Sequence, residues 1–205
     1  RFTSMLQGQR DLTTVGKMLL SELVPLVNAH QGLIYQMSTE GTPQLRMLAS
    51  YGNISGSNEG EGYPQQLAIG DGLIGQCAAD MRRILVSNVP PDTVPVGSAL
   101  FQALPRSLAV FPVVFEGQIK AVLGLASLNE FAPAHIAFLE QLTTSIGIVL
   151  NSIEATMQTE ALLEQSQQLA VELQTQQTEL QQTNEQLAQK AQQLAEQNVE
   201  VERKN

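Results

Sequence analysis

The last 58 residues of the chain, Ile148 to Asn205, contain neither glycine nor proline. Within this stretch an apolar residue returns at every seventh position, at Leu173, Leu180, Leu187, Leu194 and Val201. A seven-residue repeat keeps one narrow stripe of an α-helix turned toward a partner helix, and the two helices then supercoil. The repeat therefore predicts a long helix that pairs with a second copy of itself.

The heptad leucines can occupy either of two seam positions. With Leu173 at d, the a positions are Leu163, Ala170, Gln177, Asn184, Ala191 and Asn198. Leucine at d with asparagine at a favours two parallel strands, because a buried amide fixes the register while costing stability. With Leu173 at a, Leu162 and Leu169 become d residues, so the register near Leu169 stays open. We predict a parallel seam at Leu163, Leu173, Leu180, Asn184, Leu187, Leu194, Asn198 and Val201.

The composition of the chain changes before this repeat begins. From Gln158 to the end there are 14 glutamines, eight acidic and three basic residues, and no aromatic residue. Nearly all the glycine, proline and aromatic residues come earlier, in a region long enough to bury one core. We predict a globular domain over 1–152 and a coiled-coil helix over 153–205. A solvated helix that only separates its neighbours is the alternative.

Charge and cysteine content exclude several classes of partner. A net charge of -9 disfavours nucleic acid, since phosphate binding needs clustered lysine and arginine. The single cysteine, Cys77, cannot form a disulfide within the chain and fits a reducing, cytoplasmic compartment. No run of apolar residues reaches the length of a membrane span, so we expect no membrane contact here. We also expect the sequence to be part of a longer protein. Whether that protein has a membrane anchor elsewhere stays open.

Periodicity and turn residues predict an α+β fold. Helical spacing of apolar residues follows Asp11, and Pro133 opens the last helix at a favoured first position. The expected strands cover 32–37, 44–51, 84–87, 108–115 and 119–127, with short helices ending near Arg82 and over 98–104. This order predicts an antiparallel sheet with helices mainly on one face. The first and last helices should cover the same face and pack together.

Four segments of the globular region are informative together: GDGLIGQ at 70–76, RILVSNV at 83–89, RSLAVFPV at 106–113 and GQIKAVLGL at 117–125. In this order and spacing they resemble a GAF domain, the small-molecule sensory module of signalling proteins. The tail, at 179–185 and 195–205, resembles the signalling helix that joins such modules to the kinase core of bacterial hybrid sensor histidine kinases. The resemblance implies a GAF-like antiparallel sheet with flanking helices.

The resemblance also implies a ligand cavity between the sheet and the segments 84–104 and 106–113. Such cavities are mostly apolar, with a few polar groups that orient the ligand. The spaced set of residues found in cyclic-nucleotide-binding relatives is not recognisable here, so a cyclic nucleotide is not favoured. The identity of the ligand stays open. The candidate ligand-binding residues are Tyr35, Asn88, Asp92, Ser98, Phe101, Arg106 and Ser107.

A competing motif lies within the glycine-rich segment. Gly70, Gly72 and Gly75 spell G-x-G-x-x-G, and Asp92 follows twenty residues after Gly72. A dinucleotide site would need a buried strand before the glycines and a complete βαβ unit after them. The preceding residues 63–66 are polar, so we expect the glycines to serve a tight bend with positive φ instead.

Residues that could carry catalysis are few. Cys77 has no histidine near it in the sequence, and His30 and His135 are the only imidazoles. Resemblance to methionine sulfoxide reductases would imply several cysteines. Two histidines without a cluster of cysteines or acids make no metal site. We therefore expect no catalytic residue, metal or cofactor in this chain, with ATP and Mg²⁺ confined to the parent kinase core.

These observations favour a non-catalytic relay. We expect a homodimeric sensory fragment of a two-component sensor histidine kinase that binds an unidentified small molecule or transmits an upstream signal. The kinase domain would follow in the same chain. Two alternatives stay open: a ligand-free module that dimerises and separates its neighbours, and the sensory module of another effector, such as a cyclic-dinucleotide enzyme.

Overall fold

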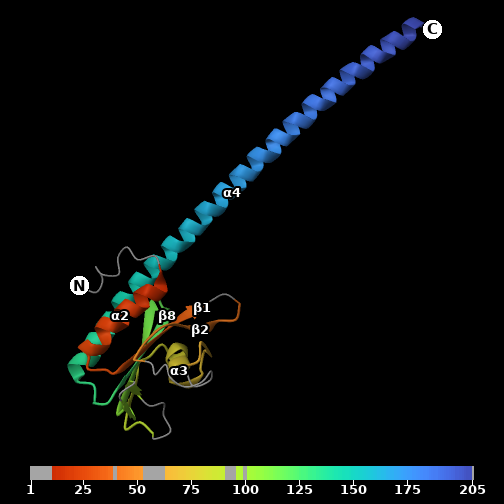
Figure 1. The fold of residues 1–205 in the computed structure, drawn as a ribbon. Helices are drawn as coiled ribbons and strands as arrows, with labels where there is room; N and C mark the ends of the chain where they lie inside the picture. The colour runs from red at the N-terminus through yellow and green to blue at the C-terminus, as the bar shows by residue number, and fades with distance from the viewer. Residues whose placement is uncertain (1–10, 39–40, 53–62, 91–95, 99–100, 205) are drawn as a thin grey trace. The chain divides into compact units, whose positions relative to one another are not determined.

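The computed structural model describes residues 11–38, 41–52, 63–90, 96–98 and 101–204. Within them lie a six-stranded sheet, a separate two-stranded hairpin and three helices (Figure 1). The chain divides into two compact units, Arg1–Ala155 and Thr156–Asn205. The α+β architecture predicted from the sequence, with a GAF-like sheet and a long last helix, is confirmed.

The six-stranded sheet is antiparallel throughout, in the order β3-β2-β1-β8-β7-β4. The tight turn between β7 and β8 uses Glu116 and Gly117, both at positive φ (48° and 75°), as a two-residue hairpin turn requires. The strand bounds are β1 Gln31–Ser38, β2 Gln44–Tyr51, β3 Gln66–Ala68, β4 Ile84–Ser87, β7 Ser107–Phe115 and β8 Gln118–Ser127.

Helix α2 (Leu12–Leu26) begins directly after Asp11, as predicted, and Asp11 caps it. The Asp11 carboxylate accepts hydrogen bonds from the backbone N–H groups of Thr13 and Thr14, at 3.1 and 3.0 Å. Such a cap satisfies donors that have no partner within the helix. Pro25 lies in the last turn of the helix, where it has no N–H to donate to the carbonyl four residues earlier.

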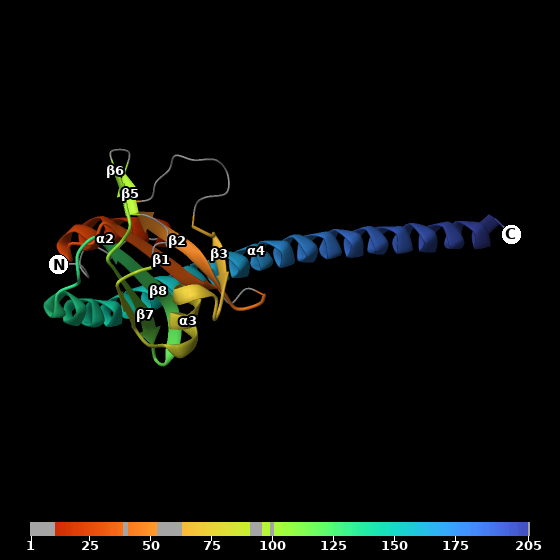
Figure 2. The same cartoon turned by 90° about the horizontal axis from the view of Figure 1, so that it is seen from below.

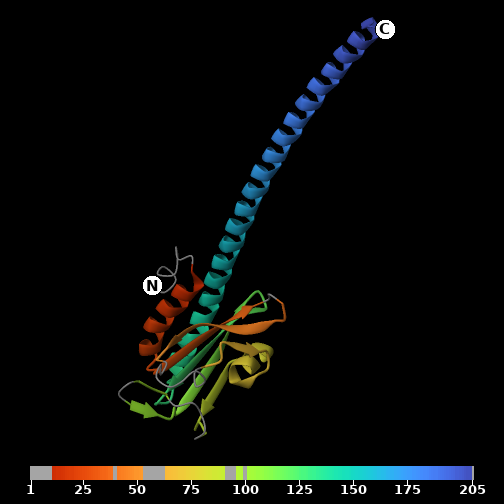
Figure 3. The same ribbon diagram turned by 45° about the vertical axis from the view of Figure 1, so that its right-hand side comes forward.

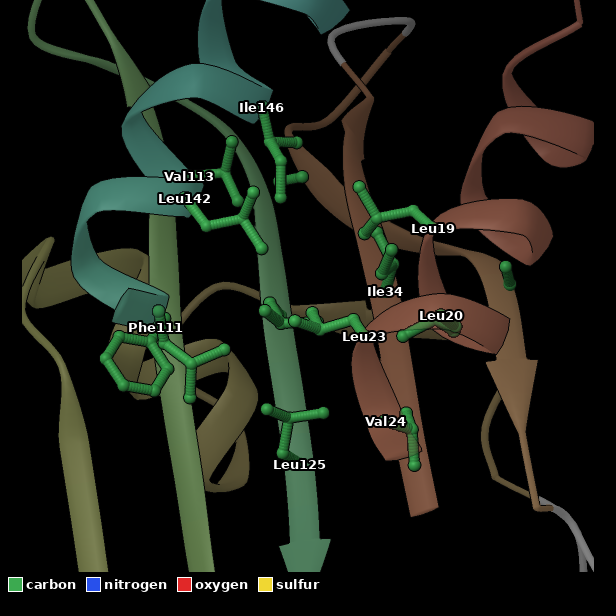
Figure 4. Close-up of a cluster of buried hydrophobic side chains, with 14 of the residues drawn as sticks. Leu19, Leu20, Leu23, Val24, Ile34, Phe111, Val113, Leu125, Leu142 and Ile146 are labelled. Atoms are coloured by element: carbon green, nitrogen blue, oxygen red, sulfur yellow. The ribbon is translucent and has the colours of Figure 1, made fainter. Parts of the chain in front are cut away.

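Helices α2 and α4 (Pro133–Lys204) cover one face of the sheet. Figure 3 shows α2 beside the first part of α4, with α3 on the opposite side of the sheet. Their apolar side chains share one buried cluster, so the predicted packing of the terminal helices on a common face is confirmed. Each fully buried aliphatic or aromatic side chain contributes roughly 1.5–3 kcal/mol. Figure 4 shows part of this cluster: Leu19, Leu20, Leu23, Val24, Ile34, Phe111, Val113, Leu125, Leu142 and Ile146.

Helix α3 (Gly72–Asp80) packs on the other face of the sheet. Its buried residues Cys77 and Ala78 join a second, smaller cluster from the strands. Gly70 and Gly72, at φ 93° and 60°, form the bend before the helix, as predicted. The strand members of the second cluster that are fully buried are Tyr35, Leu45, Val110 and Val122.

Helix α4 begins at Pro133, the predicted position. Within the part of the chain that the structure describes, it is the one helix whose length and composition would suffice to cross a membrane. Its most apolar 18-residue window has a mean hydropathy of 1.4, and 39% of that window is buried in the fold. Leu139, Leu142 and Ile146 of this helix belong to the buried cluster on the sheet.

The prediction of a short helix over 98–104 is wrong. This segment holds a hairpin of β5 (Val96–Ser98) and β6 (Phe101–Ala103), apart from the six-stranded sheet (Figure 2). Strand β3 was not predicted. Segments this short contain too few periods to distinguish a strand from a helix by spacing.

Candidate functional site

A cavity of about 170 Å³ lies on the α3 face of the sheet. Its floor is central strand β8, where Gly124 pairs with Leu33 and Val110 on the two neighbouring strands. Because directly paired residues point to the same face, two large side chains flank a position that has none. The complete lining is Gln31, Leu33, Tyr63, Leu73, Ile74, Leu108, Val110, Gly124, Leu125 and Ala126.

The roof of the cavity comes from the first turn of α3. A Cβ atom placed on Gly124 would lie 2.9 Å from Cδ1 of Ile74, so the glycine lets α3 approach the sheet. The next residue on the same face of β8, Ala126, pairs with Gln31 and Leu108. Two small residues in succession on the central strand therefore leave a hollow that their large neighbours surround.

The polar groups of the cavity are neutral. Gln31 is only 3% exposed, and its Nε2 donates to the Gly52 carbonyl at 3.1 Å. Burial raises the pKa of Tyr63, so its hydroxyl stays protonated at neutral pH. Among the described residues, no acidic or basic side chain lines the cavity. An ionic ligand would lose its hydration there without gaining an oppositely charged partner, which costs free energy. A neutral ligand does not meet this cost.

Tyr35 is the predicted ligand-binding residue that lies on the cavity's side of the sheet. It belongs to the second cluster, is 1% exposed, and its hydroxyl donates to the Pro64 carbonyl at 2.8 Å. Burial, and then the nearby Tyr63, raises the pKa of Tyr35 to about 12. This side chain supports the cavity from the adjoining cluster, but it does not line it.

Three other candidates do not line this cavity. Asn88 is exposed at positive φ (59°), and its N–H donates to the Arg106 carbonyl at 3.1 Å. The Arg106 side chain, 64% exposed, forms an ion pair with Glu130 at 3.3 Å. Ser107 is buried, and its hydroxyl donates to the Asn129 carbonyl at 2.6 Å. Each therefore has a structural partner, and a ligand-binding role for these residues stays a prediction.

The remaining candidates cannot be compared with the cavity. Asp92 lies outside the described residues. Ser98 and Phe101 are described through their backbones, at the facing ends of β5 and β6, where they pair with each other. Their predicted roles stay predictions.

Cys77 has the properties of a core residue. It is fully buried in the second cluster, and burial, with a smaller effect of Asp80, raises its pKa to about 12. A nucleophilic cysteine needs a lowered pKa, because the thiolate is the reactive form. This thiol is therefore unsuited to nucleophilic or redox catalysis at neutral pH.

The histidines do not form a metal site. His30 accepts a long hydrogen bond from the Leu128 N–H at its Nδ1, 3.4 Å away, and His135 lies in the first turn of α4. Across the described ranges, no group of three or more His, Cys, Asp or Glu side chains is arranged to hold a metal ion.

The topology rules out a dinucleotide-binding unit at the three glycines. Strands β3 and β4, which precede and follow α3, lie at opposite edges of the sheet. A βαβ unit would place them close together and parallel. Gly75 instead allows a close approach, since a Cβ there would lie 2.5 Å from the Ala68 carbonyl oxygen.

The far ends of the cavity strands contact α4 through Glu154. Its carboxylate accepts from Nε2 of Gln36 on β1 at 2.9 Å and pairs with Nζ of Lys120 on β8 at 3.1 Å. The Lys120 and Glu154 side chains are only 18% and 24% exposed, so water screens this pair less than a surface pair. A second ion pair joins Arg83, just before β4, to Glu140 of α4.

Sequence reasoning did not identify the cavity lining or Glu154. The candidates predicted from the sequence are mostly polar side chains, whereas the cavity depends on the small residues Gly124 and Ala126 between larger neighbours. Small residues at alternate positions of an otherwise apolar strand were the available signal. The contacts of Glu154 join residues 34 and 118 positions apart, which no local pattern reveals.

The family model described as "GAF domain" matches residues 9–151. One similar solved structure is the GAF domain of a phosphoenolpyruvate-protein phosphotransferase from Acinetobacter, with 16% identity and a TM-score of 0.58, covering 76% of this chain and 91% of that chain. No curated protein is significantly similar in sequence.

Two further similar structures come from other functional classes. A free methionine-R-sulfoxide reductase from Neisseria meningitidis, solved with its substrate, has 18% identity and a TM-score of 0.58, over 76% of this chain and 87% of that chain. Residues 122 to 287 of a methyl-accepting chemotaxis protein have 17% identity and a TM-score of 0.57, over 76% of this chain and 98% of that chain. At these identities the likeness shows the fold alone.

Proposed function

The chain belongs to the GAF domain family, and we propose that it senses a small neutral ligand and relays its binding, as a homodimer, through α4 to a histidine-kinase core. The observation that supports sensing most directly is the uncharged cavity against α3, walled by the two strands whose far ends contact Glu154. Membership of the GAF family supports a signalling role.

The cavity limits the class of ligand. An apolar cavity of about 150 Å³ accommodates a benzene molecule, so about 170 Å³ suits a small ring compound. Gln31 and Tyr63 offer amide and hydroxyl groups for one or two hydrogen bonds. A neutral aromatic or alicyclic compound with one polar group fits this lining better than a nucleotide or an organic acid.

The relay depends on strands that the cavity and α4 share. A ligand that separates α3 from Gly124 would shift β8, and Lys120, four residues along that strand, holds Glu154. A ligand changes an equilibrium only by its different affinity for two arrangements. We infer that occupancy biases how firmly Gln36 and Lys120 hold the end of the domain's part of α4.

Filling the cavity is expected to abolish ligand binding. Phenol, indole and cyclohexanol serve as neutral probes, with benzoate as the charged control, in a thermal-unfolding titration. At ten times its dissociation constant, a ligand stabilises the fold by about 1.4 kcal/mol, which raises Tm by roughly 3–6 °C. Ala126→Leu should remove this shift, and Ala68→Leu, on an exposed edge strand, should retain it.

The titration also tests the ligand-free alternative. Equal shifts for the native chain and Ala126→Leu would place binding elsewhere. Absence of any saturable shift across the probes, together with no small molecule co-purifying in native mass spectrometry, would favour a module that only dimerises and separates its neighbours.

The kinase and relay parts of the proposal share one test, made on the full-length protein. We expect autophosphorylation from ATP, with a rate that a cavity ligand changes by several fold. Glu154→Gln should keep the ligand-induced Tm shift and reduce the change in rate, since the amide cannot form the ion pair with Lys120. Glu164→Gln, at an exposed position further along α4, is the matched control. A protein without autophosphorylation would contradict the kinase assignment.

A further inference from the structure

One apolar stripe of α4 is uncovered within the domain. Leu142 and Val149 are buried in the core, 7% and 8% exposed, whereas Ile148 is 56% exposed. Two and three heptads beyond Ile148, the side chains of Leu162 and Leu169 are 66% and 52% exposed. Residues seven apart on a helix can face a single partner helix. The stripe available for dimerisation therefore begins at Ile148, before the domain ends.

The buried residues decide the heptad frame of this first stripe. With Leu173 at d, counting back by sevens places Leu142 and Val149 at a, where a seam needs them to face the partner. Both side chains instead contact the domain's own core. With Ile148 at d, the two buried residues fall at e, and the positions b, e and f face the sheet. The d positions Gln141, Ile148 and Ala155 are exposed, whereas Phe138, at an a position before the stripe begins, packs against the core.

The charges of the second half favour the other frame. With Leu173 at d, Lys190 lies at g, on the flank of the seam, and Glu179 and Glu200 lie at c, away from it. With Leu173 at a, Lys190 falls at d and both glutamates at g. Two copies would then bury two ammonium groups against each other, which is costly without a counter-charge. The second half therefore keeps the leucines at d and Asn184 at a.

We propose that a second copy of this chain docks in parallel along the stripe that begins at Ile148, and that the seam changes frame between Leu169 and Leu173. The spacing of four residues between these two d positions, in place of seven, is a stutter, which locally unwinds the supercoil. The inference rests on the dimer of the proposed function and puts Leu162, not Leu163, in the seam. The seam is then Ile148, Ala155, Leu162 and Leu169, followed by Leu173, Leu180, Asn184, Leu187, Leu194, Asn198 and Val201.

The occupant is a second copy of the chain, because the stripe is long and the residues beside it can face the same residues of another copy. From Ile148 to Val201 it extends about 80 Å at 1.5 Å per residue, well beyond the three to four heptads that identify a coiled coil. In the combined frame the glutamates lie at b, c or f, except Glu172 near the stutter and Glu202, which lies at e after the last seam residue. Two acidic chains can thus pair with few like charges beside the seam. The glutamates at b, c or f are Glu154, Glu160, Glu164, Glu179, Glu185, Glu196 and Glu200.

The frame change gives the relay a two-state element. Moving the second-half leucines from d to a requires a rotation of each helix by roughly one-seventh of a turn. The break after Leu169 allows that rotation while the first stripe stays paired. Ligand binding in the domain could therefore reach the far end of α4 as a rotation about its axis.

Cysteine cross-linking of the 205-residue chain tests the frame with matched neighbours. Copper-phenanthroline oxidation is followed by non-reducing electrophoresis, and the native chain is the control because Cys77 is fully buried. Leu162→Cys and Asn184→Cys, at d and a, should form dimers at least about tenfold faster than Leu163→Cys and Thr183→Cys, at e and g, because a disulfide needs Cβ atoms about 4 Å apart. Ile148→Cys should also cross-link.

Each other pattern overturns a defined part of the proposal. Fast cross-linking of Leu163→Cys and Asn184→Cys would mean a single frame along the helix, with Leu173 at d. Fast cross-linking of Leu162→Cys and Thr183→Cys would mean a single frame with Leu173 at a. Either result removes the frame change and leaves the dimer intact. Failure of Ile148→Cys alone would end the seam outside the domain. A monomer in light scattering, with no cross-link at any position, would remove the dimer itself.

Discussion

Replacing Leu180 and Leu187 together by asparagine is expected to convert the dimer into a monomer. Both leucines lie in the seam whichever heptad frame the second half adopts, and each side chain is about 60% or more exposed in the single chain. Burying a leucine contributes roughly 1.5–3 kcal/mol, so four of them in a dimer contribute about 6–12 kcal/mol. A loss of this size weakens association by at least about four orders of magnitude. Multi-angle light scattering of the purified chain measures the result.

Gln182 and Gln189 provide the matched control for this change. Neither lies at a or d in either frame, so replacing both by asparagine alters helix propensity equally and spares the seam. The control should stay dimeric. Asn184→Leu should tighten association and broaden the range of oligomers, since a buried amide restricts the oligomeric state. An unchanged mass for the double leucine variant would show that this stripe is not the interface.

The elements predicted correctly from sequence are those whose own residues specify them. Asp11 caps α2, Pro133 opens α4, and Glu116 and Gly117 form the turn between two apolar strands. Each feature acts within a few residues of the element that it delimits, so a local pattern suffices. A helix was predicted over 98–104, where β5 and β6 are too short for spacing to be decisive.

The candidate site was harder to predict, because it depends on which strands are neighbours. Gly124 and Ala126 become a cavity floor only when Leu33, Val110 and Ile74 surround them. The sequence order places these residues in four separate elements. Similarly, Glu154 looks like one more solvated glutamate until Lys120 and Gln36 are brought beside it. Polar side chains attract attention in a sequence, and here the space left by small ones carries the proposed function.

Gly147→Ala is expected to destabilise the domain, although it replaces glycine by the best helix former. Gly147 lies in α4 where the helix crosses β7, above a register shift between Val113 and Val114. A Cβ at this position would lie 2.6 Å from the Val114 carbonyl oxygen and 3.2 Å from its carbon. These are backbone atoms of a paired strand, so they cannot move aside as the end of a side chain can.

The sign of this effect reports the fit between α4 and the sheet. At an exposed helical site the same substitution stabilises the fold by about 1 kcal/mol. Overpacking at this site should instead cost roughly 1–3 kcal/mol of stability. Urea denaturation followed by circular dichroism measures the difference, with Thr144→Ala, on the exposed side of α4, as the control. A gain in stability for Gly147→Ala would mean that α4 does not rest on β7 at this point. The close contact between α4 and β7 would then be absent. The support that fixes the positions of Glu154 and Ile148 on the same helix would be absent with it.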